Sequence, residues 1–354
     1  MSRFLSYRLK ALKPYTPGEQ PGERKYIKLN TNESPFPPSP KAQELAAAEI
    51  EKLMLYPDPD SEALTAALAE ELGVPTSSVV LGNGSDEILN FAFMAFCDEG
   101  RPALFPDITY GFYKVFAAVN ALPYREIPLT DSFEIQIDDY IGQDGTVFIA
   151  NPNAPTGIAL PLTEVERLLS SNPDRVVVID EAYVDFGGES AVSLIGKYPN
   201  LLVTGTFSKS RSMAGARLGF GIGQPELISD LTRIRYSTNP YNVNRMTAAA
   251  GLGALKDKDY FLNNCRAIIE NREWATAELR ALGFTMTESK ANFIFASSDR
   301  ISGEEIYLAL KERGVLVRHF TGERICNYNR ITVGNKEEMQ ILVSTIKEIL
   351  EATQ

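Results

Sequence analysis

The sequence predicts an α/β protein with a large domain, in which a mostly parallel sheet lies between helices, and a smaller α+β domain. Short apolar runs rich in β-branched residues alternate with helical patterns over about 79–222, which is typical of a parallel sheet covered on both faces. Beyond about residue 256, long helical patterns with fewer strands replace this rhythm. We therefore expect an arm over residues 1–40, a large domain over 41–255 and a small domain over 256–354.

The N-terminal third begins with an extended arm and two helices. Seven prolines between residues 14 and 40 disfavour a long helix or a central strand. Apolar spacing predicts a first helix around 45–54, and leucines four residues apart predict a second over 64–72. Asp60 is the expected N-cap of the second helix, and Gly73 its expected end.

The remaining elements follow in order along the chain. Strands are expected at 79–81, 103–105, 147–149, 176–179, 201–203 and 218–222, and helices at 86–97 and 110–119, with a further helix opened by a capping box of Thr163 and Glu166. In the small domain we expect helices at 258–281, at 303–313 and from 336, and strands at 293–295, 315–317 and 330–333. Ligands of such parallel sheets bind at the carboxyl ends of the strands.

Composition excludes several classes of protein. Among 354 residues, 35 Lys and Arg stand against 46 Asp and Glu, and 35 − 46 gives a net charge of −11 that repels nucleic acid and anionic membranes. No run approaches the roughly 20 apolar residues of a membrane span. Three scattered cysteines and one histidine argue against a disulfide framework, a metal site and a histidine-based triad. We expect a cytoplasmic protein that holds any small anionic ligand with a few local arginines.

The first strand end with candidate chemistry is the segment Gly82-Asn83-Gly84-Ser85-Asp86-Glu87. Small residues between a strand and a helix allow backbone N–H groups and the helix N-terminus to face a phosphate. An ordinary tight turn, with Asp86 as a favourable acid in the first helical turn, explains the same residues.

A second strand ends in Asp180-Glu181-Ala182-Tyr183. A carboxylate at the tip of a buried strand is costly unless it meets a cation or a donor, and a protonated heterocyclic nitrogen would serve Asp180. The alternative is a helix N-cap.

A third strand leads into the segment from Thr206 to Arg217, which holds Ser208 and Lys209. Most lysines are solvated surface residues. Here the neighbouring hydroxyls and arginine are phosphate ligands, and a lysine amine forms Schiff bases with carbonyl groups. Pyridoxal phosphate needs such a lysine, an acid at its pyridinium nitrogen and a phosphate cup.

Taken together, the motifs resemble those of a known family. They are Thr31-Asn32-Glu33-Ser34-Pro35, Tyr56-Pro57, Gly82 to Glu87, Thr109-Tyr110, Asn151 to Gly157, Asp180 to Tyr183, Ser208-Lys209, Ala214 to Arg217 and Arg330 to Gly334. Their order and spacing resemble the fold-type I pyridoxal-phosphate aminotransferases, and among these most of all the histidinol-phosphate aminotransferase group. The resemblance runs from about Pro14 to the last helix.

The resemblance implies a role for each matching residue. Lys209 would hold pyridoxal 5′-phosphate and move the proton at the substrate Cα, Asp180 would keep the pyridine nitrogen protonated, and Tyr183 would donate to the phenolic oxygen O3′. Tyr110 would stack on the ring. The other expected cofactor ligands are Gly84, Ser85, Asp86, Asn153, Thr206, Ser208, Arg217 and, from a partner subunit, Tyr56, for which a half-buried interface aromatic is the alternative.

Two positions depart from the family pattern. The family usually has a second asparagine that reaches O3′, and here Ala154 stands in its place. Asn153, a water molecule or Tyr183 alone would have to make that contact. Arg211 occupies a position where many relatives have an aromatic or aliphatic residue, and the sequence alone offers no physical account of it.

The resemblance also indicates the substrate, through matching residues of the small domain and of the arm. Arg330 matches the carboxylate-binding arginine of the family, and Arg318 is placed to converge with it if their strands are neighbours, although a surface salt bridge would also explain Arg318. Tyr15 matches an arm tyrosine that reaches the partner's substrate phosphate, and Asn32 is a further expected substrate ligand. Two guanidinium groups and a phenol suit a phosphate.

The resemblance therefore implies transamination of L-histidinol phosphate with 2-oxoglutarate in a homodimer with shared active sites. Its small-molecule partners are a phosphorylated amine and a 2-oxo acid. An aromatic amino-acid aminotransferase and a threonine-phosphate decarboxylase are alternatives of the same class. A dehydrogenase with a dinucleotide site at Gly219 to Gly223 is disfavoured, because the spacing is wrong and the glycines lie in a strand-like run. An inactive regulator is disfavoured because Lys209, Asp180 and Arg217 are all present.

Overall fold

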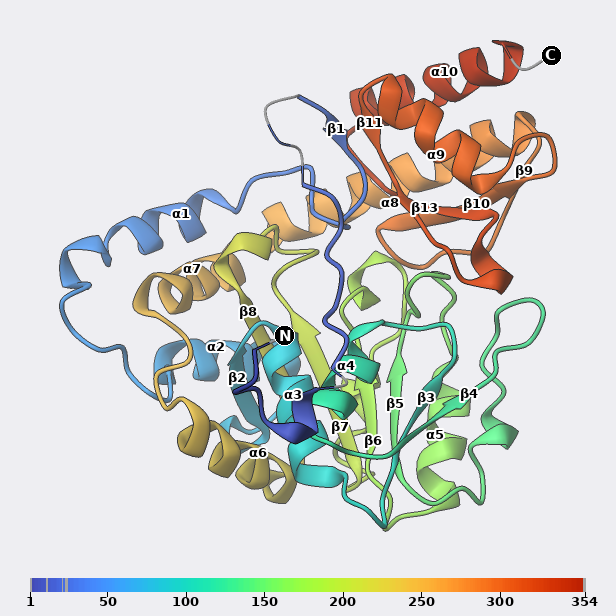
Figure 1. Cartoon of the computed structure of the whole chain (residues 1–354). Coiled ribbons are helices and arrows are strands. Elements are labelled where there is room, and N and C mark those ends of the chain that lie inside the picture. Colours follow the sequence, from blue (N-terminus) through green and yellow to red (C-terminus); the bar gives the residue numbers. More distant parts are fainter. Residues whose placement is uncertain (1, 11, 21, 23–24, 353–354) are drawn as a thin grey trace.

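The computed structural model describes residues 2–10, 12–20, 22 and 25–352, and shows a large domain, a smaller domain and an arm that runs between them (Figure 1). The large domain is built on a seven-stranded sheet with the order β2-β8-β7-β6-β5-β3-β4. All neighbouring strands are parallel except β8, which is antiparallel to both β2 and β7. The strands are β2 (Val79–Asn83), β3 (Ala103–Pro106), β4 (Tyr124–Ile127), β5 (Thr146–Ala150), β6 (Val177–Asp180), β7 (Leu201–Thr206) and β8 (Leu218–Gly223).

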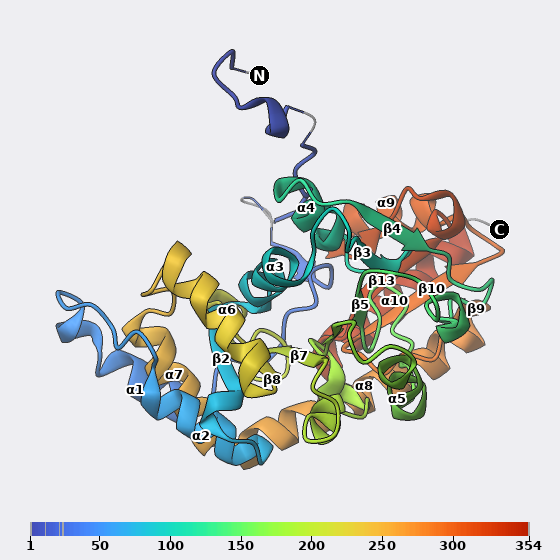
Figure 2. The same ribbon diagram turned by 90° about the horizontal axis from the view of Figure 1, so that it is seen from below.

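Two layers of helices cover this sheet, and this explains why its central strands are almost continuously apolar. Figure 2 shows α3 and α4 on one side of the strands and α2, α5 and α7 on the other. In β6, Val177 and Ile179 pack with the second layer and Val178 with the first. The helices are α1 (Pro40–Ala47), α2 (Glu62–Leu72), α3 (Ser85–Phe96), α4 (Phe112–Val119), α5 (Leu162–Ser171), α6 (Pro225–Thr238) and α7 (Arg245–Lys256).

The small domain has its own apolar core under a four-stranded antiparallel sheet of order β12-β13-β10-β9. The strands of this sheet are β9 (Phe284–Met286), β10 (Phe293–Ser298), β12 (Arg318–His319) and β13 (Tyr328–Thr332), and the domain also contains the separate strand β11 (Val315–Leu316). Its helices are α8 (Lys258–Ala281), α9 (Gly303–Glu312) and α10 (Lys336–Ala352). The arm joins this domain, because β1 (Ile27–Lys28) pairs in parallel with β11.

The structure confirms the predicted mostly parallel sheet and most of the expected elements. Gly73 ends α2 in the left-handed conformation, with φ of 68°. The antiparallel setting of β8, the strands β4 and β9 and the helices α6 and α7 were not predicted. The division of the chain into three parts at residues 40 and 255 stays a prediction.

Three local predictions were wrong. Asp58, not Asp60, accepts from the first N–H of α2 at 2.7 Å, while Asp60 binds Arg235 and Tyr236. The expected capping box does not form, because α5 begins at Leu162 and no side chain caps its first turn. The expected helix around 45–54 is a short α1 followed by a separate 3-10 turn at Ile50–Lys52.

No helix among the described residues has the length and apolar character needed to cross a membrane.

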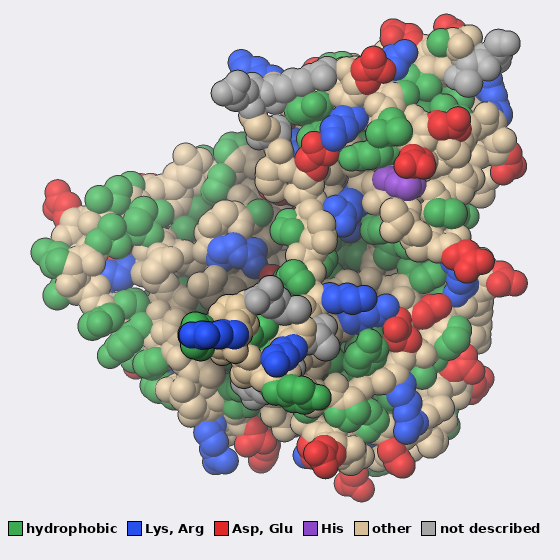
Figure 3. All heavy atoms as spheres, viewed as in Figure 1, with side chains coloured by type: hydrophobic (Ala, Val, Ile, Leu, Met, Phe, Trp, Pro, Cys, Tyr) green, Lys and Arg blue, Asp and Glu red, His purple; other side chains and the backbone are tan. Residues whose placement is uncertain are grey.

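Charge is unevenly distributed over the surface. Figure 3 shows Lys and Arg side chains around the hollow between the two domains, although the chain as a whole is acidic.

Candidate active site

Two adjoining cavities lie at the carboxyl ends of the parallel strands. The inner cavity has a volume of about 340 Å³ and is lined mainly by the large domain. The outer cavity, of about 770 Å³, opens between the arm, the large domain and the small domain. The residues that line both cavities are Thr31, Tyr110, Ala154, Tyr183 and Lys209. Lys209 therefore stands where the two cavities meet.

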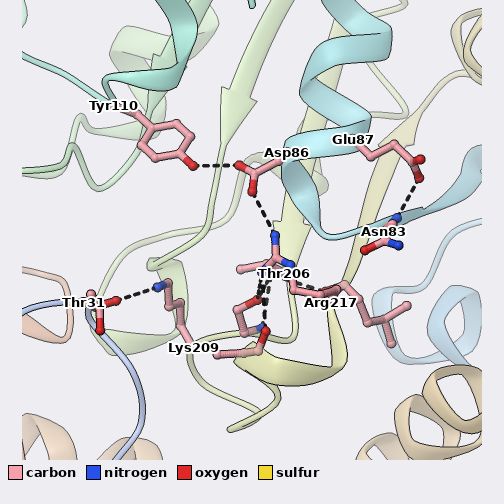
Figure 4. A network of polar contacts seen from close by, with 11 residues as sticks. Thr31, Asn83, Asp86, Glu87, Tyr110, Thr206, Lys209 and Arg217 are labelled. Atoms are coloured by element: carbon pink, nitrogen blue, oxygen red, sulfur yellow. Dashed lines mark hydrogen bonds and ion pairs between the residues drawn. The ribbon is translucent and has the colours of Figure 1, made fainter. Parts of the chain in front are cut away.

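One end of the inner cavity is built from the start of α3 and the turn before β8. Gly84 precedes α3 with φ of 79°, a conformation that favours glycine, and a Cβ there would lie only 2.5 Å from Arg217 Nη2. Arg217 donates to Asp86 at 2.9 Å, and Asp86 accepts from the Tyr110 hydroxyl at 2.7 Å (Figure 4). The glycine thus lets a guanidinium approach the backbone at the N-terminus of the helix.

Hydroxyl groups complete this end of the cavity. Thr206 donates to Ser208 Oγ at 2.9 Å and accepts from the Ser208 N–H at 3.1 Å. Arg217 Nη1 lies 3.5 Å from the Ser208 hydroxyl. A helix N-terminus, two hydroxyls and a guanidinium that converge in this way fit a phosphate group.

The glycine-rich run in β8 has a packing role. β8 (Leu218–Gly223) pairs with strands on both sides, so these glycines lie within the strand, and α6 begins beyond them at Pro225. A Cβ at Gly219 would lie 2.2 Å from the backbone nitrogen of Ser85. The glycine therefore allows β8 to pass directly behind the start of α3.

The opposite end of the inner cavity is closed by the buried carboxylate of Asp180. This side chain accepts hydrogen bonds from the Tyr113 hydroxyl at 3.1 Å, and from the Thr204 hydroxyl and the Ala182 N–H at 3.3 Å each. Burial raises the pKa of Asp180 to about 6, against the effect of the Tyr113 hydrogen bond. No cation forms an ion pair with it among the described residues, so the site can accept a cationic or donor group from a ligand.

Lys209 is held by the arm and leaves its amine available. Its Nζ donates to the carbonyl oxygen of Thr31 at 3.3 Å and lies 5.7 Å from the centre of the Tyr183 ring. Within the described part of the chain, no carboxylate forms an ion pair with this amine. A lysine with a single carbonyl partner at the edge of a cavity can react with a carbonyl compound.

Tyr183, whose ring lies near the amine of this lysine, forms a hydrogen bond with Asn32. The Asn32 amide donates to the Tyr183 hydroxyl at 3.0 Å, and Thr332 Oγ1 donates to Asn32 Oδ1 at 3.0 Å. Asn32 therefore positions the Tyr183 phenol from the arm and the small domain. This contact joins two residues predicted from separate motifs.

The structure does not bring Asn153 together with the other predicted cofactor ligands. Its amide donates to the carbonyl of Ile108 and to Thr156, and its Oδ1 accepts from Thr109 at 2.7 Å. Asn153 lines neither cavity, whereas Ala154 lines both. Of the two side chains expected to make the missing asparagine's contact, Tyr183 lines both cavities and Asn153 lines neither.

Tyr56 also lies away from both cavities. Its side chain is 78% exposed and stacks on Tyr241 with ring centroids 4.6 Å apart. A single chain therefore does not place Tyr56 at its own site.

The outer cavity carries the pair of arginines expected from the sequence. Arg318 on β12 and Arg330 on β13 are direct cross-strand partners, which confirms that their strands are neighbours. Arg330 donates to the carbonyl of Asn30 at 3.2 Å, while its Nε is buried without a partner among the described residues. Desolvation by burial lowers the pKa of this guanidinium. A buried donor without a partner, on a cation that lines a cavity, fits an anion-binding position.

Arg318 ties the arm across this cavity, and among the described residues it does not form the surface salt bridge that was the alternative. Its two terminal nitrogens donate to the carbonyls of Pro17 and Thr16 at 3.4 Å each. The Tyr15 ring packs against Phe112 with centroids 4.5 Å apart and the ring planes tilted by 36°, and it lines the cavity of its own chain. That Tyr15 reaches the substrate phosphate of a partner subunit stays a prediction.

Arg211 now has a structural explanation. Its guanidinium pairs with Glu71 on α2, donates to the carbonyl of Ala254 at 3.1 Å and lies 4.0 Å above the Phe261 ring of α8. The residue ties the lysine-bearing loop to α2, α7 and the first turns of the long helix α8. It acts from behind the cavity and does not line its inner or outer part.

Sequence reasoning missed three further residues around the cavities. Tyr113, one helical turn after Tyr110, binds Asp180, and this spacing could have revealed it. Arg324 donates to Asp107 at 3.0 Å across the mouth of the outer cavity. No motif surrounds Arg324 or Asp107, so the sequence held no signal for this pair.

Comparisons of sequence agree with this geometry. The profile of the family described as aminotransferase class I and II matches residues 24–346. The histidinol-phosphate aminotransferase of Brachyspira hyodysenteriae (strain ATCC 49526 / WA1) is 49% identical over 99% of this chain and 100% of its own length. That of Marinomonas sp. (strain MWYL1) is 50% identical, again over 99% of this chain and 100% of its own length.

Solved structures share the fold. Histidinol-phosphate aminotransferase from Sinorhizobium meliloti, in complex with pyridoxal-5′-phosphate, has a TM-score of 0.90 at 23% identity and covers 100% of this chain and 99% of its own. L-threonine-O-3-phosphate decarboxylase from Porphyromonas gingivalis has a TM-score of 0.79 at 22% identity and covers 92% of this chain and 99% of its own. At these identities the likeness shows the fold alone, and it does not separate the two activities.

Proposed function

The chain belongs to the class I and II aminotransferases, and we propose that it transfers the amino group of L-histidinol phosphate to 2-oxoglutarate. The products are imidazole-acetol phosphate and glutamate. The observation that carries the proposal is the pair of adjacent arginines, Arg318 and Arg330, in the outer cavity next to Lys209. Relatives of this name at 49–50% identity over 99% of the chain support it.

The fold is that of the fold-type I aminotransferases, and the inner cavity fits pyridoxal 5′-phosphate. Lys209 forms no ion pair among the described residues and would hold the aldehyde carbon. Asp180 would face the ring nitrogen, because it is a buried carboxylate without a cation. The groups expected around the phosphate are Ser85, Thr206, Ser208 and Arg217, all of which line the cavity.

Bound pyridoxal phosphate supplies the electron sink for negative charge that develops at the substrate Cα. The chain contributes orientation and proton transfer. Once the substrate has displaced it, Lys209 Nζ would move the proton at the substrate Cα, and general acid–base catalysis of this kind contributes about 10²–10⁴ in rate. Tyr183, fixed by Asn32, would donate to the cofactor's phenolic oxygen.

The outer cavity would select the substrate by its charge. A phosphate ester meets two guanidiniums on neighbouring strands, one with a buried unsatisfied Nε, and the Tyr15 ring beside them. The carboxylates of 2-oxoglutarate can bind the same cations in the second half of the cycle. A neutral side chain such as that of phenylalanine would leave the buried Nε of Arg330 without a partner, which is costly.

The decisive experiment is a panel of half-reactions with the cofactor-loaded protein. L-Histidinol phosphate alone should bleach the yellow cofactor, with kcat/KM at least about 100-fold above that of phenylalanine, which corresponds to about 2.7 kcal/mol. L-Histidinol without the phosphate is the matched control ligand and should lose most of this advantage. Equal efficiency with phenylalanine or tyrosine would favour an aromatic aminotransferase, and carbon dioxide release from threonine phosphate would favour a decarboxylase.

We also propose that two chains form the working unit. The connection between α1 and α2 exposes apolar side chains that a partner would cover, namely Ile50, Leu53, Met54, Leu55 and Tyr56, with exposed fractions of 53–81%. The family resemblance assigns Tyr56 to the partner's cofactor site, and its exposed phenol is free to reach outward. The cytoplasmic location stays a prediction.

Mixed dimers would test this arrangement and separate Tyr56 from Tyr15. Lys209→Ala and Tyr56→Ala chains should each have low activity, and hybrids should recover a part of it, because one site then has both Lys209 and the partner's Tyr56. Hybrids of Lys209→Ala with Tyr15→Ala should not recover, since Tyr15 lines the cavity of its own chain. Verified Lys209→Ala and Tyr56→Ala hybrids without any recovery would argue against shared sites.

A further inference from the structure

Tyr113 is a buried residue of α4 that touches the cofactor-facing acid from behind. Its side chain is completely inaccessible to solvent and packs against Phe105 and Phe148, and its hydroxyl lies 3.1 Å from Asp180 Oδ2. It lines neither cavity, in contrast to Tyr110 one helical turn earlier. Two tyrosines of one segment therefore approach the site from different sides.

The hydrogen bonds that Asp180 accepts from the described residues leave one acceptor position of its carboxylate free. Its two carboxylate oxygens can accept about four hydrogen bonds in total. Oδ1 accepts from Thr204 and from the Ala182 N–H, and Oδ2 accepts from Tyr113. Counted over the described residues, one acceptor position remains, and it is on the oxygen that Tyr113 binds. A donor from the inner cavity would share that oxygen with the phenol.

The charges around this carboxylate make the Tyr113 hydrogen bond important. Burial and the neighbouring Asp86 raise the pKa of Asp180, while Tyr113, Ala182 and Thr204 oppose that rise. Tyr110 and Glu181 are the other titratable groups whose charges interact with Asp180. Burial and Asp180 itself raise the pKa of the Tyr113 phenol, so Tyr113 stays a protonated donor.

We propose that Tyr113 is a positioning residue that stabilises the ionised form of Asp180 and so keeps the shared proton on the pyridine nitrogen of the cofactor. The inference rests on the proposed cofactor. A carboxylate that loses one of its three donors becomes more basic, and the proton moves from the ring nitrogen toward Asp180. Tyr113 does not touch the substrate cavity, so it acts on the cofactor's electronic state and not on substrate binding.

The test is Tyr113→Phe in the full chain, loaded with pyridoxal 5′-phosphate that carries ¹⁵N at the ring nitrogen. The ¹⁵N chemical shift should stay at the protonated value between pH 6 and 9 in the wild type and move toward the unprotonated value in the variant. The cofactor dissociation constant should rise about tenfold, equivalent to about 1.4 kcal/mol. With L-histidinol phosphate, kcat should fall about tenfold while KM changes less than about twofold.

Two further variants make the outcome decisive. Tyr140→Phe removes the hydroxyl of another buried tyrosine, which packs in the core on the other face of the sheet, and it should leave the ¹⁵N shift unchanged. Thr204→Val removes a donor to the other carboxylate oxygen and should move the shift in the same direction as Tyr113→Phe, by a smaller amount.

An unchanged ¹⁵N shift in a folded Tyr113→Phe protein would overturn the proposal. A Tyr113→Phe chain that melts far below Tyr140→Phe would also overturn it, because the hydroxyl would then serve folding. The ¹⁵N shift and the cofactor affinity need no substrate, so they report on Tyr113 even if histidinol phosphate proves to be the wrong substrate.

Discussion

The inner and outer cavities differ in how the chain assembles them. The inner cavity is formed mainly by strand ends and turns of a single sheet, with Asp180 at the end of β6, Lys209 after β7 and Arg217 before β8. The outer cavity combines the arm, a large-domain loop and the strands β12 and β13 of the small domain. We infer that the inner cavity is preorganised by one domain, whereas the outer one depends on how three segments meet.

The largest expected effect tests the inner cavity. Lys209→Ala should lower turnover by about 10⁴-fold or more, because it removes both the covalent attachment of the cofactor and the group that would move the Cα proton. Steady-state assays with histidinol phosphate and 2-oxoglutarate measure the loss. The protein should still fold, because Lys209 makes only one hydrogen bond among the described residues. Retained turnover would refute the assigned role of this lysine.

This difference also explains what could be predicted from the sequence. Residues of the inner cavity lie in short motifs at predicted strand ends, so Lys209, Asp180 and Arg217 could be placed together before the fold was known. The residues next to them could be predicted as well, because they belong to the same short motifs. The antiparallel direction of β8 could not be predicted, since an apolar run has the same pattern in either direction.

The outer cavity was harder to predict because its contacts join distant parts of the chain. Arg324 and Asp107 are 217 positions apart, and nothing near either residue indicates the other. Tyr15 lines the outer cavity of its own chain, and the sequence alone cannot tell which subunit's cavity an arm enters. Ala154 correctly marked a departure from the family pattern, but only the structure shows that Asn153 is bonded elsewhere.

The second prediction compares the two arginines of the outer cavity. Arg330→Gln should lower kcat/KM for histidinol phosphate about 100-fold, since truncating a buried charge contact costs about 2–5 kcal/mol. Arg318→Gln should lower it about tenfold, because Arg318 is more accessible and also binds the arm. Arg313→Gln on the exposed end of α9 is the control and should change little. An Arg330→Gln enzyme with normal kcat/KM would exclude this phosphate site.

The third prediction concerns stability behind the inner cavity. Glu181 follows Asp180, is buried, and accepts hydrogen bonds from Ser190 Oγ and the Ala191 N–H at 2.6 Å each. Burial raises the pKa of Glu181 from its ordinary value of 4.5 to about 8. The folded protein therefore binds more protons than the unfolded chain between these values, and the free energy of unfolding should fall as pH rises from about 4.5 to about 8.

Glu181→Gln should remove part of this pH dependence. The amide can keep both hydrogen bonds if the Ser190 hydroxyl reverses its role, and it carries no charge to desolvate. The free energy of unfolding of the cofactor-free protein should be measured by chemical unfolding between pH 5 and pH 9. The value for the variant minus the value for the wild type should be about 2 kcal/mol larger at pH 9 than at pH 5. Glu348→Gln on the exposed face of α10 is the control. A pH profile parallel to the wild type would show that Glu181 is not the cause.

The smallest effect is expected at the contact that joins the domains across the outer cavity. Arg324 in the loop between β12 and β13 donates to Asp107 and to the carbonyls of Leu129 and Thr130, at 3.0, 3.0 and 2.6 Å. Its side chain is 35% exposed, so the ion pair itself contributes no more than about 1 kcal/mol.

Arg324→Gln should therefore raise KM for histidinol phosphate by about three- to tenfold and change kcat less than about twofold. Arg101→Gln, which breaks an exposed local pair with Asp98, should leave both constants unchanged. If Arg324→Gln lowers kcat as strongly as it raises KM, the contact affects the inner cavity too, and the two cavities are not independent.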